Sequence, residues 1–313
     1  MKISVIVPCY NEEEALPIFY EEVTRVLGER MPLYDYELLL INDGSRDNTL
    51  AIMQKLAAED EHIRYLSFSR NFGKEAGMYA GLSNAEGDLV AVMDADMQDP
   101  PSLLPAMAEL LTLEQCDCVA ARREDRSGEP PVRSWFARLF YKLINRISDV
   151  EIVDGARDFR LMKRPMVDAL VRMGEYNRFS KGLFAWVGFK THWLSYKNVE
   201  RVAGETKWSF WSLFKYAVDG VMNFSQVPLT LCSWGGIFMT AFSMLMVVFL
   251  VLRKLIFGDP VQGWPSLACI IVFLAGLQMF SIGILGQYLA KTYMESKHRP
   301  QYIIAETNKP DAK

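Results

Sequence analysis

The stretch Leu89-Val90-Ala91-Val92-Met93-Asp94-Ala95-Asp96-Met97-Gln98 joins an apolar run to two carboxylates that are separated by one residue. A continuous aliphatic run is typical of a strand that is buried on both faces of a parallel sheet. Ligands of open α/β sheets bind at the carboxyl ends of the strands, where Asp94 and Asp96 would lie. Because residues i and i+2 of an extended segment point to the same side, both carboxylates can face one ligand.

Two hard oxygen ligands beside a phosphate-bearing substrate are the usual way in which proteins hold Mg²⁺ or Mn²⁺. The pair therefore predicts a metal site at Asp94 and Asp96. In a second interpretation, the two residues only cap a strand-to-helix turn before Pro100 and Pro101. An Asp-x-Asp pair alone does not decide between these two interpretations.

Strand and helix patterns alternate from residue 1 to about residue 121. This alternation predicts an α/β domain with a mostly parallel sheet, flanking helices and right-handed crossovers. We expect strands at Ile3–Pro8, Tyr36–Ile41, Ile63–Phe68, Asp88–Asp94 and Cys118–Ala121. We expect four helices. The first covers Ala15–Gly28, the second ends at Glu59, the third ends near Ala85, and the fourth begins at Pro100 and Pro101.

Polar loops follow the predicted strands, so they should gather at one edge of the sheet. The side chains that meet there would be Tyr10, Asn11, Glu12, Asp43, Arg70, Lys74, Asp94 and Asp96. A site with this mixed charge suits a nucleotide diphosphate and a metal ion. The chain has neither a Gly-x-Gly-x-x-Gly fingerprint nor a P-loop, which argues against dinucleotide oxidoreductases and NTPases.

The overall composition of the 313 residues excludes other classes of function. The net charge of −4 gives no basic excess that would indicate nucleic-acid binding. The five cysteines form no Cys-x-x-Cys pair and the three histidines are scattered, so we expect reduced thiols and no zinc cluster. The chain opens on a strand pattern and shows no signal peptide, so we expect a cytoplasmic soluble part.

Two long apolar stretches follow the charged part of the chain. Leu229–Leu252 has no charge over 24 residues, and Leu267–Gly286 has none over 20. Roughly 20 helical residues span a ~30 Å hydrocarbon core, so we expect a transmembrane hairpin rather than two buried helices. The count of basic residues at the two membrane faces favours a cytoplasmic main domain.

Two further segments combine basic and aromatic residues. Arg133–Arg146 has apolar residues at helical spacing, which predicts a helix in the membrane interface. The alternative is a helix that packs on the sheet with a solvated basic face. The aromatic side chains of Trp208–Tyr216 suit the headgroup layer before the first span.

Five motifs follow one another along the chain. They are Val7-Pro8-Cys9-Tyr10-Asn11-Glu12-Glu13, Asn42–Asp47, Asp94–Pro101, Asp158–Met162 and Glu200–Ser209. The first two resemble signatures of family 2 glycosyltransferases, which have the GT-A fold. The other three resemble the polyprenyl-phosphate branch of that family, which includes bacterial undecaprenyl-phosphate glucosyltransferases and dolichol-phosphate mannose synthases. The resemblance runs to about residue 300.

The resemblance implies a domain organisation. A cytoplasmic GT-A catalytic domain would cover residues 1–207, and a juxtamembrane amphipathic helix would cover 208–226. Two transmembrane helices would lie within 227–288, at about 229–252 and 267–287. Residues 289–313 would form a cytoplasmic tail.

The resemblance also implies an inverting hexosyltransferase at the cytoplasmic face of the inner membrane. It would move one sugar, with UDP-glucose as the expected donor, to undecaprenyl phosphate, and so supply a lipid-linked sugar for glycan or cell-envelope modification. Mg²⁺ or Mn²⁺ on Asp96 and Asp94 would neutralise the departing diphosphate. Gln98 would contact the sugar or the metal shell. The nucleotide-sugar site would comprise Pro8, Tyr10, Asn11, Glu12, Asp43, Lys74, Asp94 and Ala95. The kinship implies a homo-oligomer, namely a tetramer.

Asp158 has three possible roles. The resemblance suggests a catalytic base. However, a phosphate monoester with a second pKa near 6 is largely dianionic at pH 7 and is already nucleophilic. Asp158 would then orient the acceptor or take up a residual proton, or it would only pair with Arg160. The acceptor phosphate would be bound by Arg122, Arg126, Arg201 and Lys207, with plain surface charge as the alternative.

Two other classes of function remain possible. A processive polysaccharide synthase of the same fold typically has a Gln-x-x-Arg-Trp motif and more spans, which this chain lacks. A non-catalytic membrane scaffold would not need Asp94, Asp96, Asp158 and Arg201 to be intact.

Overall fold

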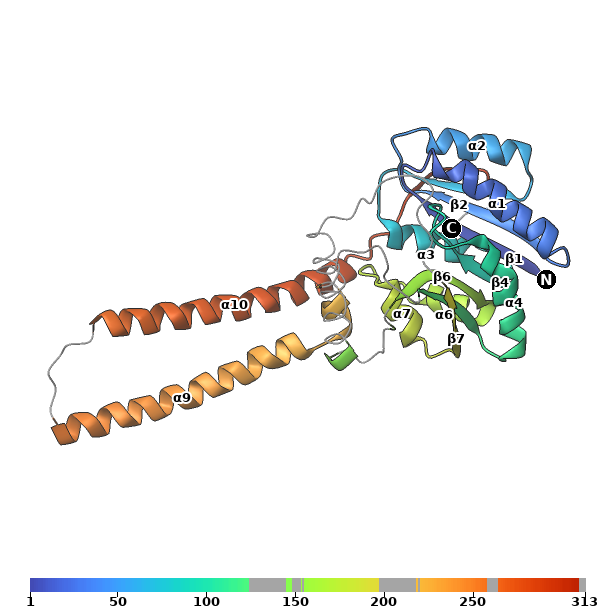
Figure 1. The fold of residues 1–313 in the computed structure, drawn as a ribbon. Coiled ribbons are helices and arrows are strands. Elements are labelled where there is room, and N and C mark those ends of the chain that lie inside the picture. Colours follow the sequence, from blue (N-terminus) through green and yellow to red (C-terminus); the bar gives the residue numbers. More distant parts are fainter. Residues whose placement is uncertain are drawn as a thin grey trace.

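An eight-stranded sheet organises the domain, with its strands in the order β7-β5-β6-β4-β1-β2-β3-β8 (Figure 1). The computed structural model describes residues 1–123, 145–147, 153, 155–196, 218, 220–257 and 264–309. The strands are β1 (Lys2–Cys9), β2 (Asp35–Asn42), β3 (Ile63–Phe68), β4 (Leu89–Val92), β5 (Cys118–Arg123), β6 (Ala156–Lys163), β7 (Thr191–Tyr196) and β8 (Ile304–Thr307).

The first four strands are parallel neighbours. Ile6 in β1 lies opposite Leu39 of β2 and Val92 of β4, and all three side chains are fully buried. A parallel sheet that is apolar on both faces needs helices on both sides. The predicted α/β class, a mostly parallel sheet with flanking helices, is therefore confirmed.

Helices pack on both faces of the sheet. Phe19 of α1 and Leu104 of α4 belong to the core on one face, whereas Met78 of α3 and Leu170 of α6 belong to the core on the other. The helices of the sheet domain are α1 (Ala15–Arg30), α2 (Thr49–Glu59), α3 (Lys74–Asn84), α4 (Leu104–Leu113), α6 (Arg164–Arg172) and α7 (Ser180–Trp186), with a 3₁₀ turn, η1, at Pro101–Leu103.

Two strands run against the parallel direction. Strand β6 lies antiparallel between β4 and β5, and β8 lies antiparallel to β3 at the edge of the sheet. Strand β6 has four charged residues, Arg157, Asp158, Arg160 and Lys163, so the sequence shows no long apolar run there. Strand β4 ends at Val92, earlier than the predicted end at Asp94, because the chain already turns there into residues 93–100, which contain Asp94, Asp96 and Asp99 and which we call the acidic loop.

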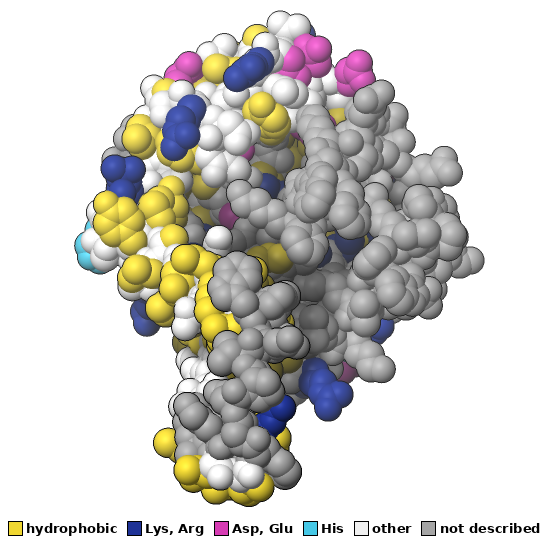
Figure 2. Space-filling model, turned by 90° about the vertical axis from the view of Figure 1, so that its left-hand side faces the viewer, with side chains coloured by type: hydrophobic (Ala, Val, Ile, Leu, Met, Phe, Trp, Pro, Cys, Tyr) yellow, Lys and Arg dark blue, Asp and Glu magenta, His cyan; other side chains and the backbone are white. Residues whose placement is uncertain are grey.

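Two long apolar helices, α9 (Val227–Phe257) and α10 (Trp264–Ser296), extend together from the sheet domain (Figure 1). Within them, Val227–Met246 and Ile270–Ser296 are long and apolar enough to span a membrane. Large apolar side chains such as Phe238 are exposed along both helices, and Figure 2 shows such side chains gathered over the hairpin. An exposed apolar surface of this size indicates an interaction with a membrane or a protein partner.

The chain returns to the sheet after α10. Thr307 of β8 lies opposite Leu66 of β3, and the ring of Tyr302 stacks on that of Phe68 at a centroid distance of 5.0 Å. Part of the segment that the sequence suggests to be a tail is thus an edge strand of the sheet. The two basic and aromatic segments lie mostly outside the described residues, apart from a helical turn at residues 145–147.

Candidate functional site

The loops after β1 and β2 are joined by direct hydrogen bonds. The Oδ1 atom of Asn11 accepts a bond of 2.8 Å from the backbone N–H of Arg46, and the backbone N–H of Asn11 donates to the Ser45 hydroxyl at 3.0 Å. Asn11 has a φ of 54°, a left-handed conformation that asparagine adopts more readily than most residues. The backbone N–H of Glu12 donates to Thr49 Oγ1 at 2.8 Å. These contacts fix the predicted nucleotide-binding residues Asn11 and Glu12 at the carboxyl edge of the sheet.

Asp43 joins the second loop to the third. Its two carboxylate oxygens accept bonds from the backbone N–H groups of Phe72 and Gly73, at 2.6 and 3.0 Å. Burial raises the pKa of Asp43, although both backbone bonds favour the charged form. Gly73 has a φ of 97°, which glycine adopts without strain, and α3 begins at the next residue. Asp43 thus sets the position from which Lys74 projects.

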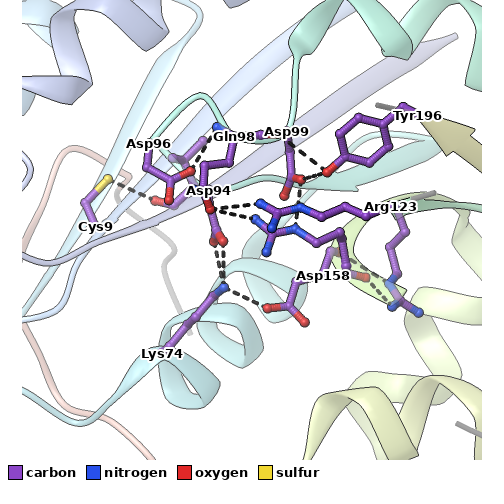
Figure 3. A network of polar contacts seen from close by, with 12 residues as sticks. Cys9, Lys74, Asp94, Asp96, Gln98, Asp99, Arg123, Asp158 and Tyr196 are labelled. Carbon is purple, nitrogen blue, oxygen red and sulfur yellow. Dashed lines mark hydrogen bonds and ion pairs between the residues drawn. The ribbon is translucent and has the colours of Figure 1, made fainter. Parts of the chain in front are cut away.

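Lys74 lies between two carboxylates from different parts of the chain (Figure 3). Its Nζ is 2.7 Å from Asp94 Oδ1 and 2.7 Å from Asp158 Oδ2. Burial alone would raise the pKa of Asp158, but the positive charge of Lys74 outweighs it and holds that pKa well below its usual range. Likewise, burial would lower the pKa of Lys74, but Asp158 and Asp94 together raise it. Lys74 and Asp158 are therefore both charged at neutral pH.

In the described part of the chain, the Asp158 carboxylate forms no salt bridge with Arg160, although Arg160 Nε donates to the backbone oxygen of Asp158 at 3.3 Å and its charge also lowers the pKa of Asp158. Arg160 donates from Nη2 to the backbone oxygen of Arg157 at 2.9 Å, and its guanidinium lies 3.4 Å from the ring centroid of Phe184. The carboxylate of Asp158 pairs with Lys74 instead. An ionised carboxylate has no proton to donate and is a good hydrogen-bond acceptor, so Asp158 is suited to orient a polar group.

A second polar cluster lies on the other side of the acidic loop (Figure 3). Asp99 is fully buried, and its Oδ1 accepts hydrogen bonds from Arg157 Nε at 2.9 Å and from the Tyr196 hydroxyl. Burial, followed by the charge of Asp99, raises the pKa of Tyr196 to about 12, so the phenol keeps its proton. We call Asp99, Arg157 and Tyr196 the buried cluster.

The buried cluster reaches Gln98, which the resemblance places at the sugar or the metal shell and among the expected catalytic residues, with Asp96 and Asp158. Gln98 Oε1 accepts hydrogen bonds from Arg123 Nη2 at 3.0 Å and from Arg157 Nη2 at 3.4 Å. The backbone N–H of Gln98 donates to Asp96 Oδ1 at 3.1 Å. Two guanidinium groups therefore orient the amide, and the loop backbone orients Asp96. Sequence reasoning missed Asp99, Arg123, Arg157 and Tyr196. Asp99 and Arg157 had a local signal, since Asp99 lies within the motif Asp94–Pro101 and Arg157 directly precedes another motif, but Tyr196 had none.

A metal ion would need the carboxylates of the acidic loop. Among the described residues, no three Asp, Glu, His or Cys side chains form a group that could hold one. Mg²⁺ is usually bound by one or two carboxylates and completed by substrate phosphates. Asp94 and Asp96 fit such an incomplete site, and the ammonium of Lys74 at 2.7 Å shows that Asp94 is already placed to bind a cation. None of the described cysteines, Cys9, Cys116, Cys118 and Cys232, takes part in a disulfide.

The other predicted site residues are placed as follows. Pro8 lies near the end of β1, Tyr10 is half-buried in the loop that follows, and Ala95 is buried between the two acidic residues. Arg122 is exposed near the end of β5. The remaining predicted phosphate-binding residues, Arg126, Arg201 and Lys207, lie outside the described residues.

Comparison with known proteins identifies the family. A family model described as Glycosyl transferase family 2 matches residues 4–171. A prophage bactoprenol glucosyl transferase homolog of Escherichia coli K12 is 43% identical over 309 residues, which cover 99% of this chain and 100% of the relative. The bactoprenol glucosyl transferase of Shigella phage SfV is 44% identical over 304 residues, which cover 97% of this chain and 98% of that protein.

A solved structure shows a similar fold at low identity. It is a mannosyltransferase from Pyrobaculum calidifontis in complex with GDP-Man and Mn²⁺. It aligns with a TM-score of 0.50 and 15% identity, and the alignment covers 92% of this chain and 86% of that one. Fold, acidic loop and sequence relatives agree, and the chain belongs to glycosyl transferase family 2.

Proposed function

We propose that this enzyme transfers one glucose from UDP-glucose to a polyprenyl phosphate, undecaprenyl phosphate in bacteria, at the cytoplasmic face of the inner membrane. The observation that carries the proposal is the ionic bridge of Lys74, because it joins Asp94 on the predicted donor side to Asp158 on the predicted acceptor side. The bactoprenol glucosyl transferases that align over nearly the whole chain support glucose as the sugar and a polyprenyl lipid as the acceptor.

Residues on the first two loops and the acidic loop would bind the donor. Pro8, Tyr10, Asn11, Glu12, Asp43 and Ala95 would line the nucleotide and ribose site. Asp96, with Asp94, would hold Mg²⁺ or Mn²⁺, and the bound metal would neutralise the charge that develops on the leaving diphosphate. Gln98 is held by two guanidinium groups beside Asp96 and would contact the sugar.

The acceptor arrives as an anion and needs orientation more than deprotonation. One phosphate oxygen of the polyprenyl phosphate attacks the anomeric carbon of glucose, and the bond from that carbon to the diphosphate breaks, which releases UDP. A single displacement inverts the configuration. Asp158, held ionised by Lys74, would orient the acceptor or accept a residual proton. Arg122, Arg126, Arg201 and Lys207 would offset the negative charge of the two substrates.

The hairpin of α9 and α10 would hold the enzyme in the membrane that contains its acceptor. The residues before α9 would lie at the interface. We also expect a homo-tetramer. A Cβ atom added at Gly235, Gly236, Gly283 or Gly286 would meet nothing within 4 Å, so these helix faces are open to close packing with a second copy.

A direct assay tests the proposal. Purified full-length enzyme in lipid nanodiscs is given UDP-glucose, UDP-galactose, UDP-N-acetylglucosamine or GDP-mannose, with undecaprenyl phosphate and either Mg²⁺ or Mn²⁺. We expect nucleoside diphosphate release from UDP-glucose that requires both the lipid and the metal, and a product with a single sugar. Undecaprenol without its phosphate is the matched control. A product with several sugars would indicate a processive synthase, and the absence of lipid-dependent release with every donor would overturn the proposal.

A further inference from the structure

The loop between α6 and α7, residues 173–179, is bound to the base of the hairpin. The carboxylate of Glu295, in the last turns of α10, accepts hydrogen bonds from the backbone N–H of Tyr176 at 3.1 Å and of Asn177 at 3.0 Å. The side-chain amide of Asn177 also donates to Glu295, at 3.2 Å. Glu295 therefore fixes the backbone of this loop, which we call the docking loop.

The segment before α9 holds the docking loop from the other side. The side-chain amide of Asn223 donates to the backbone oxygen of Asn177 at 2.7 Å, and Lys291 of α10 donates to Asn223 Oδ1 at 2.7 Å. A Cβ atom added to Gly182, just past the loop, would lie 2.5 Å from the ring of Phe224, so only glycine permits this contact. Both ends of the hairpin thus contact the same short segment.

The docking loop and the residue that follows it, Ser180, contact the start of α3. The backbone N–H of Ser180 donates to Glu75 Oε2 at 3.1 Å, and the Ser180 hydroxyl donates to the same oxygen. The guanidinium of Arg178 lies over the ring of Tyr79, 4.5 Å from its centroid. Ser180 and Arg178 therefore bind the docking loop to the first two turns of α3.

Glu75 follows Lys74 in the first turn of α3, where backbone contacts hold the chain on both sides. Asp43 accepts from the N–H of Gly73, and Ser180 donates to Glu75. The Lys74 ammonium must meet Asp94 and Asp158 at 2.7 Å each, so a small rotation of this turn would break one of the two contacts. Misplacement of about 1 Å in an active site costs as much as 10²-fold in rate.

We propose that Glu75, Ser180 and Glu295 are positioning residues that join the base of the membrane hairpin to Lys74. The hairpin then helps to position Lys74 and its two carboxylate partners, in addition to binding the membrane. This inference rests on the proposed function for its kinetic consequence only, because the predicted change of structure at α3 does not depend on the substrate.

Kinetics of full-length enzyme with a short-chain, water-soluble polyprenyl phosphate test the inference, because membrane partition then plays no part. Ser180→Ala removes the hydrogen bond from the Ser180 hydroxyl to Glu75. Glu295→Gln removes the negative charge that accepts the hydrogen bonds of the docking loop. We expect each to lower kcat by about tenfold, the size of one lost charge-assisted hydrogen bond, with an unchanged KM for UDP-glucose. The kcat of the double variant should fall by less than the product of the two single reductions, because both substitutions act on Lys74 through the same docking loop.

Controls separate this role from general stability. Thr292→Val, one turn before Glu295 on an exposed position, removes only a bond to the Tyr288 carbonyl of the same helix and should keep the wild-type kcat. Ser180→Thr keeps the hydroxyl and should restore most of the activity that Ser180→Ala loses. Melting temperatures identify any variant that fails to fold.

Amide hydrogen exchange gives a readout that needs no substrate. In Glu295→Gln and Ser180→Ala we expect faster exchange in the first turns of α3, at residues 74–80, and unchanged exchange in α1. Wild-type exchange in α3 together with wild-type kcat in both variants would overturn the inference and leave the proposed function intact. A wild-type enzyme that is inactive with every donor would overturn the proposed function, and the exchange data would still decide this inference.

Discussion

Two charged clusters flank the acidic loop, and they differ in their access to solvent. In the first, the side chains of Lys74, Asp94 and Asp158 are 37%, 23% and 17% exposed. In the buried cluster, the side chain of Arg157 is 23% exposed, but the carboxylate of Asp99 with which it pairs has no exposed surface. Partly solvated ion pairs can exchange partners with a ligand at little cost, whereas breaking a buried pair is strongly destabilising. The first cluster is therefore suited to contact the substrates, and the buried cluster is suited to stabilise the fold. Substitutions in the first should mainly lower the rate, and substitutions in the second should mainly lower stability.

Asp96, on the loop between the clusters, should give the largest effect. Asp96→Ala should lower turnover by about 10³-fold or more, because metal stabilisation of a leaving group is worth several kcal/mol and each 1.36 kcal/mol is tenfold in rate. UDP release measures the loss, and the melting temperature should stay near that of the wild type. Asp168→Ala, on an exposed position of α6, is the matched control. An active Asp96→Ala enzyme would disprove the metal assignment.

Asp158→Asn tests the exposed cluster with almost no change of volume. It removes the charge that faces Lys74, so the ammonium keeps only Asp94 as an ionic partner among the contacts described above. We expect a loss of about 10²-fold in kcat, typical of a positioned catalytic group. The melting temperature should fall modestly, because the substitution removes the stabilising pair with Lys74 at a partly solvated position. A large drop of the melting temperature with kcat retained would instead assign Asp158 to support.

Arg157→Met tests the buried cluster. It leaves the Asp99 carboxylate buried without its arginine, which should cost about 3–5 kcal/mol of unfolding free energy. A thermal melt of the full-length protein should show a clear decrease. Arg25→Ala removes an exposed arginine that pairs with Glu22 and Glu29, and should leave the melt unchanged. Equal melting temperatures for the two variants would contradict the contrast between clusters.

The dependence on pH should be the smallest effect. Lys74 holds the pKa of Asp158 below its unfolded value, so the stabilising contribution of that carboxylate is complete above about pH 4 and is lost only as pH falls through the lower folded pKa. Between pH 5 and 8 the rate should instead follow the acceptor phosphate, whose second pKa is near 6. We expect kcat/KM to fall by about tenfold per unit below that pKa. An enzyme pKa near 7 in this profile would instead indicate a general base.

The parts of the fold that depend on local sequence were predictable. Strand β3 has the predicted bounds Ile63–Phe68, and the other parallel strands begin and end close to their predicted limits, because each is a short apolar run between turn residues. Because a polar loop follows each of these strands, the sequence also predicted that Asp43, Lys74 and Asp94 lie at one edge of the sheet. No similar signal exists for β6, whose charged residues interrupt its pattern.

The remaining features depend on contacts between distant residues. Tyr196 bonds to Asp99 across 97 positions of the chain, and Tyr65 bonds to Glu306 across 241. Neither Tyr196 nor Glu306 lies in a recognisable motif, so the buried cluster and strand β8 could not be predicted from their own surroundings. The docking of Glu295 on Asn177 had no sequence signal for the same reason.

Strand β8 has a consequence for biosynthesis. Residues 304–307 leave the ribosome after both apolar helices, yet they pair with β3, which is made long before them. Domains of nascent chains fold from the N-terminus, and an unpaired strand edge is a template for aggregation. The outer edge of β3 therefore stays open until the hairpin has been synthesised, and its closure by β8 marks the last step in maturation of the sheet.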